Sequence, residues 1–298
     1  MNKLMECVPN FSEGRNSEII EQIANAFRNK GGVTLLDYSG DVDHNRMVIT
    51  AIGEPQALKA AVVEAIGVAV NLIDLNQHSG VHPRMGAVDV VPFIPIKDCT
   101  MDEAVALSKE VAEEVANLYD LPVFLYEKSA SASHRENLAS VRKGGFEGLE
   151  AKFLLPEWKP DYGPLHKHPT AGAVAIGARN PLIAFNVNLG TNNLAIAGSI
   201  ARKVRFIGGG LRYCKAMGVA LEKQGIVQVS MNLTDYTQTS VYRVFELVKV
   251  EALRYGVPIV GSELIGLIPL AAIADTAAYY LRLDNFSVNQ ILENHLME

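Results

Sequence analysis

The sequence has few cysteines, no long apolar run and no excess of basic residues, and each shortage excludes a class of protein. Its three cysteines, Cys7, Cys99 and Cys214, lie far apart without a C-x-x-C pair, so neither a zinc knuckle nor a disulfide framework is indicated. The longest apolar run, residues 264–274, is interrupted by Pro269 and is much shorter than the ~20 residues that a membrane-spanning helix needs. We therefore expect no membrane association.

The charge balance excludes a second class. With 27 Lys and Arg against 33 Asp and Glu, the formal net charge is −6. Nucleic-acid binding requires clustered cations to neutralise phosphates, so we expect small molecules and no nucleic acid as partners. The first residues carry Glu6 and Pro9, where a signal peptide would need an unbroken apolar segment, and a cytoplasmic location is expected.

What the sequence contains is the composition of a globular protein with alternating helical and strand periods. Its 298 residues, 49% of them hydrophobic, suffice for one large domain or two smaller ones. Strands are predicted from β-branched and apolar runs at 33–38, 47–53, 88–96, 123–128, 173–178, 182–189, 214–221 and 226–233. Helices are predicted after a cap at Asn16 or Ser17, from Pro55 to about 74, after capping boxes at Thr100–Glu103 and Ser133–Glu136, and near 192–206, 239–255 and 269–282.

This pattern indicates an α+β fold. Helices segregated onto sheets of partly hairpin-connected strands are typical of split βαβ sandwiches and not of one doubly wound sheet. Residues 156–172 are rich in proline and have neither period, so we expect a connector there and call this segment the connector. The expected domains are residues 1–171 and 172–298.

The densest polar cluster is NQHSGVHPRMGAVD, residues 76–89, between a predicted helix and a predicted strand. His82 precedes Pro83, which favours an extended backbone, and its imidazole can accept and donate protons near neutral pH. Arg84 supplies a fixed cation suited to carboxylates. The alternative is a loop whose His and Arg only cap backbone carbonyls. His78 and His82 have the spacing of a helical metal pair, but Gly80 and Pro83 disfavour a helix, so no metal is expected.

Two further clusters leave similar alternatives open. The turn between the first two predicted strands holds Asp41, Asp43, His44, Asn45 and Arg46, and is either part of a site or a solvated β-turn. The connector holds His166, Lys167 and His168. Their positive potential suits an anionic ligand, or they form an exposed linker. No phosphate loop, Rossmann fingerprint or nucleophile elbow occurs, so covalent catalysis is not indicated.

Several segments taken together resemble the formiminotransferase family: MECVPNFSEGR, LLD with DHNR, HPRMGAVDVVPFIP, GPLHKHPTAGAVAIGAR, AFNVNL and VPIVGSELIGLIPL. They occur in order over nearly the whole chain, which makes them far more specific together than any one alone. The resemblance implies two ferredoxin-like sandwich subdomains with a folate groove between them, usually in a homodimer. It also implies a metal-independent transfer of a formimino group from N-formimino-L-glutamate to the co-substrate tetrahydrofolate. This reaction would belong to histidine degradation and one-carbon metabolism.

The resemblance also implies roles for individual residues. The histidine of the family's H-P-R-M-G motif is the catalytic one and corresponds to His82. His44, Arg46 and Arg84 are expected to bind substrate. The folate-contacting segment corresponds to Gly163, Pro164, Leu165, His166, Lys167, His168, Pro169, Thr170, Ala171 and Gly172.

The sequence departs from the animal members of the family in two respects. Those members are fused to a cyclodeaminase domain, whereas this chain ends near residue 298, so we expect a separate enzyme to deaminate its product. They also carry an acidic residue, thought to orient the histidine, where this sequence has Ser39. Asp41 and Asp43 are the alternative acidic partners.

Two other functions stay open at this point. The same groove could handle 5-formyltetrahydrofolate, either by formyl transfer to glutamate or as a cyclo-ligase, because the acyl groups differ by one atom. A non-catalytic folate-binding module would bind folate and release no glutamate.

Overall fold

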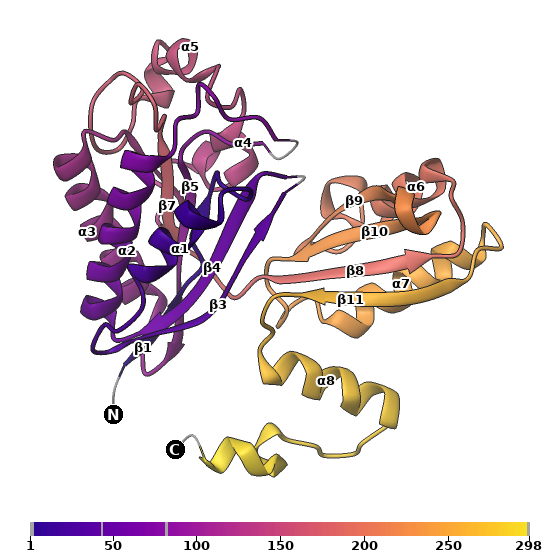
Figure 1. The fold of residues 1–298 in the computed structure, drawn as a ribbon. Helices are drawn as coiled ribbons and strands as arrows, with labels where there is room; N and C mark the ends of the chain where they lie inside the picture. Colours follow the sequence, from indigo (N-terminus) through magenta and orange to yellow (C-terminus); the bar gives the residue numbers. More distant parts are fainter. Residues whose placement is uncertain (1–2, 43, 81–82, 297–298) are drawn as a thin grey trace. The chain divides into compact units, whose positions relative to one another are not determined.

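The computed structural model describes residues 3–42, 44–80 and 83–296, and the chain divides into two compact units, Met1–Arg179 and Asn180–Glu298. In Figure 1 the first unit runs from indigo to pink and the second from pink to yellow. The division lies after Arg179, later than the expected boundary at residue 171, because the strand that follows the connector pairs within the first sheet. None of the described helices has both the length and the apolarity to cross a membrane.

The second unit has the βαββαβ order of a ferredoxin-like sandwich. Its strands form one antiparallel sheet in the order β11-β8-β10-β9, which puts the first and third strands in the centre. Helix α8 packs on α7 through the stacked rings of Tyr242 and Tyr279, 4.1 Å apart. The elements are β8 Ile183–Leu189, α6 Leu194–Val204, β9 Cys214–Leu221, β10 Ile226–Leu233, α7 Val241–Leu253, β11 Ile259–Ile265 and α8 Leu270–Leu281.

The first unit contains the same arrangement with an extension. Strands β1 and β2 are two pieces of one central strand, since both pair antiparallel with β4 and with β5, and β3 lies beyond β4. These elements make a second ferredoxin-like core. They are β1 Leu4–Cys7, β2 Asn10–Phe11, α1 Ser17–Asn25, β3 Val33–Asp41, β4 Arg46–Gly53, α2 Pro55–Leu72 and β5 Val88–Lys97.

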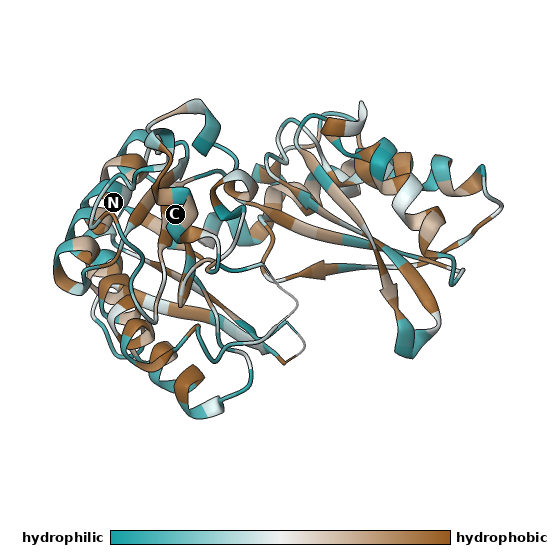
Figure 2. Cartoon of the chain, turned by 90° about the horizontal axis from the view of Figure 1, so that it is seen from above, coloured by the Kyte–Doolittle hydropathy of each residue, from teal (hydrophilic) through white to brown (hydrophobic). Residues whose placement is uncertain are grey.

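The extension adds two strands to the sheet beside β5. Strand β7 pairs in parallel with both β5 and β6, so the sheet continues in the order β5-β7-β6. Figure 1 shows α1, α2 and α3 on one side of this sheet, and Figure 2 shows hydrophobic residues alternating with hydrophilic ones along the helices. The added elements are α3 Met101–Tyr119, β6 Val123–Glu127, α4 Leu138–Arg142, α5 Leu149–Phe153 and β7 Val174–Ala178.

One of the two predicted capping boxes is present and the other is wrong. At the start of α3, Thr100 accepts from the Glu103 amide and Glu103 reaches back to the Thr100 amide. Ser133 instead begins a 3₁₀ turn, Ser133–Arg135, in which the Glu136 amide donates to the Ser133 backbone carbonyl and not to its hydroxyl. The following helix, α4, begins after Asn137, whose side chain caps it.

Candidate active site

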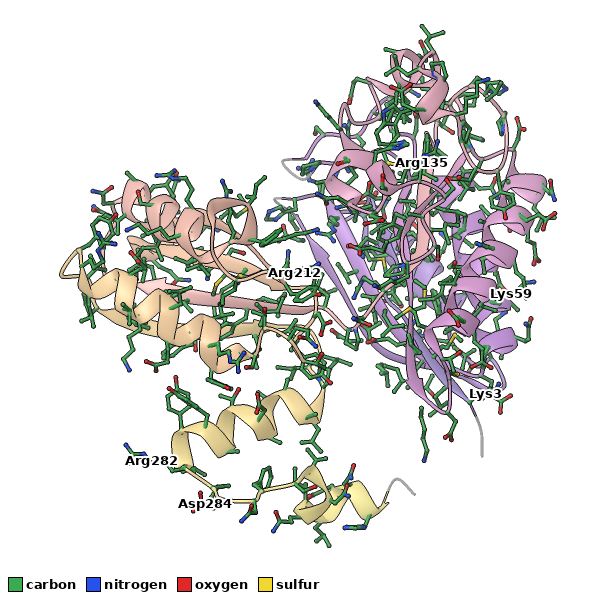
Figure 3. All side chains as sticks on the ribbon, turned by 180° about the vertical axis from the view of Figure 1, so that it is seen from behind. Lys3, Lys59, Arg135, Arg212, Arg282 and Asp284 are labelled. Atoms are coloured by element: carbon green, nitrogen blue, oxygen red, sulfur yellow. The ribbon has the colours of Figure 1, made fainter. Side chains whose placement is uncertain are left out.

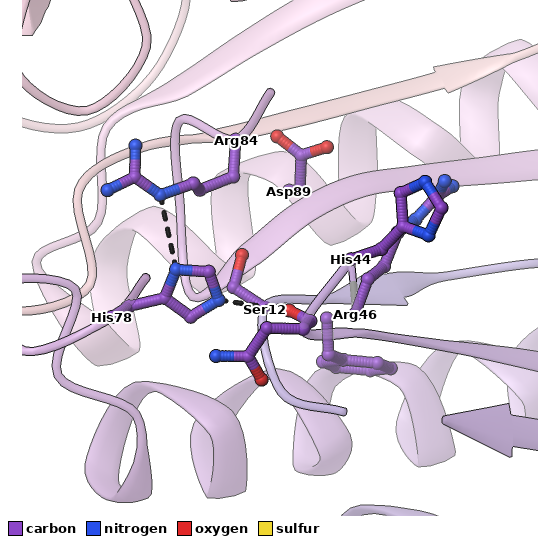
Figure 4. A pocket seen from close by; sticks show the side chains of 8 residues that line it. Ser12, His44, Arg46, His78, Arg84 and Asp89 are labelled. Atoms are coloured by element: carbon purple, nitrogen blue, oxygen red, sulfur yellow. Dashed lines mark hydrogen bonds between the residues drawn. The ribbon is translucent and has the colours of Figure 1, made fainter. Parts of the chain in front are cut away.

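A polar pocket lies at one end of the first unit's sheet (Figure 4). It brings together three residues that the sequence predicts to bind substrate, His44, Arg46 and Arg84. They come from the β3–β4 turn and from the segment before β5. The polar pocket is lined by Phe11, Ser12, His44, Asn45, Arg46, His78, Arg84 and Asp89.

Asn45 joins three segments around this pocket. It is 7% exposed and has φ of +48°, a conformation that asparagine tolerates better than most residues. Its side-chain oxygen accepts from the Gly14 amide at 2.9 Å, and its side-chain nitrogen donates to the Ser79 carbonyl at 3.0 Å. The turn is therefore fixed to two other segments at Asn45, whereas the side chains of Asp41 and His44 in the same turn are exposed.

His78 is held between Asn45 and Arg84, as the dashed lines in Figure 4 show. Arg84 Nε lies 3.3 Å from His78 Nδ1, and the Asn45 carbonyl oxygen lies 2.9 Å from His78 Nε2. Because a guanidinium can only donate, Nδ1 accepts and Nε2 carries the hydrogen that it donates to the carbonyl. Sequence reasoning considered His78 only as a metal ligand and missed this contact, for which the six-residue spacing to Arg84 gives no signal.

The guanidinium of Arg84 is bound by a carboxylate of this chain. Its two terminal nitrogens donate to the two oxygens of Glu147 at 3.0 and 2.7 Å. The hydrogen bond from Arg84 lowers the pKa of the Glu147 carboxyl. Arg84 is largely buried, with 16% of its side chain exposed, whereas 66% of the Glu147 side chain is exposed. A substrate carboxylate that binds Arg84 in this arrangement would have to compete with Glu147.

The inner part of the polar pocket has more positive than negative charge. Asp89 is 3% exposed, accepts from the Met85 amide at 3.0 Å and forms an ion pair with Arg142. Burial and, to a smaller extent, the neighbouring Arg142 lower the pKa of Arg46 to about 10, against the opposing effects of Asp89 and Asp41. Two guanidinium groups beside one buried carboxylate favour an anionic ligand.

The residues considered as acidic partners of His82 lie around the β3–β4 turn. His44 Nδ1 lies 2.9 Å from Asp41 Oδ2, and both side chains are exposed. Ser39 lies in β3 opposite Val48 of β4. Asp43 and His82 lie outside the described residues, so the catalytic role and its acidic partner stay predictions.

The connector is fixed to the pocket end of the sheet by backbone contacts. His168 and Gly172 exchange backbone hydrogen bonds of 2.9 and 3.0 Å, and the Leu75 amide donates to Thr170 at 2.9 Å. Gly172 has φ of +69° and forms an isolated β-bridge with Gly86. A Cβ added to Gly172 would lie 2.2 Å from the Met85 carbonyl oxygen. These contacts argue against an exposed linker and place residues 168–172 beside the start of β5.

The comparison with protein families shows which family the two units belong to. Residues 4–179 match the N-terminal subdomain of the formiminotransferase domain, and residues 184–297 match the formiminotransferase domain. The chain belongs to the formiminotransferase family. The two matched segments correspond closely to the two units of the structure.

Formiminotransferase relatives resemble the chain over most of its length. Glutamate formimidoyltransferase of Streptococcus pyogenes is 52% identical over 298 residues and covers all of both chains. The protein of the same name from Thermoplasma acidophilum is 42% identical, over 98% of this chain and 97% of its own. Formimidoyltransferase-cyclodeaminase of Mus musculus is 41% identical over 94% of this chain, which spans 53% of that longer protein.

Within the formiminotransferase connector, His168 predicts a pH effect on stability. Its Nδ1 accepts from the Ala171 amide at 3.0 Å and lies 3.3 Å from the Thr170 amide, so it must be unprotonated. Burial lowers the pKa of His168, Asp120 opposes this, and His166 lowers it further. The folded pKa therefore lies below the unfolded value of ~6.5, and the stabilisation present above ~6.5 is lost as the pH falls through the folded pKa.

We expect the first unit to melt at a lower temperature at pH 5 than at pH 7. Carboxylates contribute to this difference, so the matched variant is His168→Asn, whose side-chain oxygen can accept the same amides without titrating. The melting temperatures of both proteins are measured across this range. A pH dependence as large in His168→Asn as in the wild type would contradict the role of His168.

Proposed function

We propose that the protein transfers the formimino group of N-formimino-L-glutamate to N5 of tetrahydrofolate, giving 5-formimidoyltetrahydrofolate and L-glutamate. The observation that carries this proposal is the 52% identity with a stand-alone glutamate formimidoyltransferase over the whole of both chains. The reaction belongs to histidine degradation and one-carbon metabolism. We place the enzyme in the cytoplasm as a homodimer, with tetrahydrofolate as its co-substrate.

The reaction requires two proton transfers. N5 of tetrahydrofolate attacks the amidine carbon, a tetrahedral intermediate forms, and glutamate leaves as an amine. We assign to His82 both the removal of the N5 proton and the return of a proton to the departing nitrogen. One imidazole can perform both steps because its ordinary pKa of ~6.5 lies near the operating pH.

The cationic residues of the polar pocket position the substrate. Arg46 and Arg84 are proposed to hold the carboxylates of N-formimino-L-glutamate, with His44 at the outer edge. Binding both carboxylates restricts the amidine carbon to a small volume, which can contribute much of the acceleration. The buried excess of positive charge near Arg46 supports this assignment.

The connector is proposed to contact the folate through residues 163–172. Its positive side chains suit the glutamate tail, and Lys167 is positioned by the Phe146 ring, whose centroid lies 4.2 Å from Lys167 Nζ. The rigid backbone contacts at His168 and Gly172 support a binding role, because less entropy is lost when an ordered segment binds. A separate cyclodeaminase is proposed to act on the product.

The test is glutamate release from N-formimino-L-glutamate by the purified protein, with and without tetrahydrofolate. Release that depends on tetrahydrofolate supports the proposed transfer. A parallel reaction with 5-formyltetrahydrofolate and glutamate, and one with ATP in place of glutamate, detects formyl transfer or cyclo-ligase activity. Folate binding without turnover of any of these substrates would indicate a binding module instead.

Glu147 gives a sharper prediction about substrate binding. Glu147→Gln removes the carboxylate that competes for Arg84, so KM for N-formimino-L-glutamate should fall about two- to fivefold, the range of an exposed ion pair. KM for tetrahydrofolate should not change. The control is Glu136→Gln, the same substitution at an exposed position, and steady-state kinetics compare the three proteins. An unchanged or higher KM would show that Arg84 does not bind this substrate.

A further inference from the structure

One face of the second unit's sheet is polar and lies opposite the unit's helices α6 and α7. Helices α6 and α7 lie on the other face (Figure 1), against a core that includes Phe185, Val187 and Val229. Residues that alternate with these in β8 and β10 must point to the opposite face. None of the unit's described helices packs on that face. There the two central strands, β8 and β10, carry Asn186, Asn188, Gln228, Ser230 and Asn232.

Three of the side chains on this face form a closed hydrogen-bonded group. Asn188 Nδ2 donates to Glu263 Oε1 at 3.0 Å, and Gln228 Nε2 donates to Glu263 Oε2 at 3.0 Å. Gln228 Nε2 also donates to Asn188 Oδ1 at 2.8 Å. We call these residues, from β8, β10 and β11, the amide–carboxylate trio.

The trio is held more rigidly than a solvated sheet face requires. Asn188 is 8% exposed and Gln228 is 4% exposed, although the described helices α6 and α7 of this unit lie on the other face of the sheet. Their nitrogen atoms both donate to one carboxylate, which fixes the orientation of each amide because the reversed orientation would place two acceptors together. Ordering two amide side chains around one carboxylate costs conformational entropy, and contact with water alone does not require this order.

The trio retains unused hydrogen-bonding capacity. A carboxylate has about four acceptor sites, and the two amides occupy one on each oxygen of Glu263. The Asn188 amide nitrogen has a second hydrogen beyond the one that it donates to Glu263. Glu263 thus offers two adjacent acceptors, and Asn188 offers a neighbouring donor. A 2-amino-4-oxopyrimidine ring presents the complementary edge, with its 2-amino group and N3–H as donors and its 4-oxo oxygen as acceptor.

We propose that the amide–carboxylate trio of Asn188, Gln228 and Glu263 recognises the 2-amino-4-oxopyrimidine ring of a pterin. Guanine presents the same edge, and the choice of the pterin rests on the proposed function, in which tetrahydrofolate is the co-substrate. The carboxylate of Glu263 binds the 2-amino group and N3–H, and Asn188 donates to the 4-oxo oxygen. Gln228 orients Asn188 and Glu263, and both hydrogens of its side-chain nitrogen are used in these two bonds and not for the ligand.

The test is calorimetric binding of 6-methyltetrahydropterin, which lacks the benzoylglutamate tail, to the full-length protein. The wild type should bind it, and Glu263→Gln should weaken binding about 10–100-fold, because two hydrogen bonds to a charged group are lost. Guanosine is titrated in parallel. Binding of guanosine without the pterin, or no binding of the pterin to the wild type, would overturn the assignment.

Two further variants separate recognition from folding. Ser230→Leu adds bulk to the same face without touching the trio's hydrogen bonds and should also abolish pterin binding with an unchanged melting temperature. Glu246→Gln, on α7, removes an equal charge elsewhere in the unit and should bind as the wild type does. Equal pterin affinity in Glu263→Gln, Ser230→Leu and Glu246→Gln would overturn the proposal.

The outcome is distinguishable from failure of the proposed function. If no glutamate is released but pterin binding depends on Glu263, the trio is a pterin site in a protein of another activity. If glutamate release depends on tetrahydrofolate but KM for tetrahydrofolate is the same in Glu263→Gln, the function stands and the trio is not its pterin site.

Discussion

Replacing His82 with asparagine is expected to lower kcat for folate-dependent glutamate release by about 10²–10⁴-fold, the typical contribution of a well-placed general acid–base. Asparagine keeps a polar side chain of similar reach but cannot exchange a proton near neutral pH. The measurement is kcat at saturating concentrations of both substrates, with tetrahydrofolate binding measured separately by calorimetry. Because the imidazole acts on the reacting atoms, the affinity for tetrahydrofolate should change little.

The pH profile and a control variant make this test specific. The wild-type rate should depend on a group that titrates near neutral pH, and this dependence should disappear in His82→Asn. The same substitution at His295, an exposed residue that contacts Asn289, should leave kcat and the pH profile unchanged. An unchanged turnover number in His82→Asn would falsify the assignment.

Replacing Arg135 with glutamine is expected to destabilise the first unit by about 3–5 kcal/mol, the cost of leaving one partner of a buried ion pair unpaired. Arg135, labelled in Figure 3, is 6% exposed and donates to Asp161 Oδ2 at 2.7 Å. It also donates to two carbonyl oxygens of the connector at 2.7 and 2.6 Å. Its loss therefore removes the cationic partner of the largely buried Asp161 carboxylate, which keeps the hydrogen bond from the Leu125 amide, and one donor from each of two carbonyls.

The chain supplies its own reporter for this measurement. Trp158 is the single tryptophan and its ring centroid lies 5.9 Å from the Arg135 guanidinium carbon, so its fluorescence follows urea unfolding of this region. The control is Arg254→Gln, which removes an exposed ion pair with Glu251 on α7 and should change stability by less than about 1 kcal/mol. A loss below 1 kcal/mol in Arg135→Gln would contradict the structural role of this ion pair.

The fold was largely predictable where a segment has strong local signals. The cap at Asn16, the proline at the first position of α2 and the Thr100 capping box each determine a helix start from nearby residues, and all three helices are present. The ferredoxin-like class was also correct. Strands β1, β2 and β11 were missed because the first two are short and separated by Pro9, and β11 is an edge strand with partly exposed residues.

The site was predictable as a set of clusters but not as a network. Local composition identified the β3–β4 turn and residues 76–89, and the structure brings His44, Arg46 and Arg84 to one pocket. Local composition could not identify Glu147 as the partner of Arg84, or Arg142 as the partner of Asp89, because only the tertiary fold brings such distant positions together. The Asn188, Gln228 and Glu263 contacts likewise depend on strand register.

The connector also forms hydrogen bonds with the edge strand β6, and we expect this pairing to limit aggregation. Strand β6 is an edge of the first sheet and four of its five residues are buried, the type of edge that recruits strands of other molecules. The connector occupies this edge, because the Val123 amide donates to Tyr162, the Asp161 amide donates to Val123, and the Leu125 amide donates to the Asp161 side chain. A segment proposed to bind folate thus also caps a sheet edge, so variants that loosen it should precipitate at concentrations where the wild type stays dissolved.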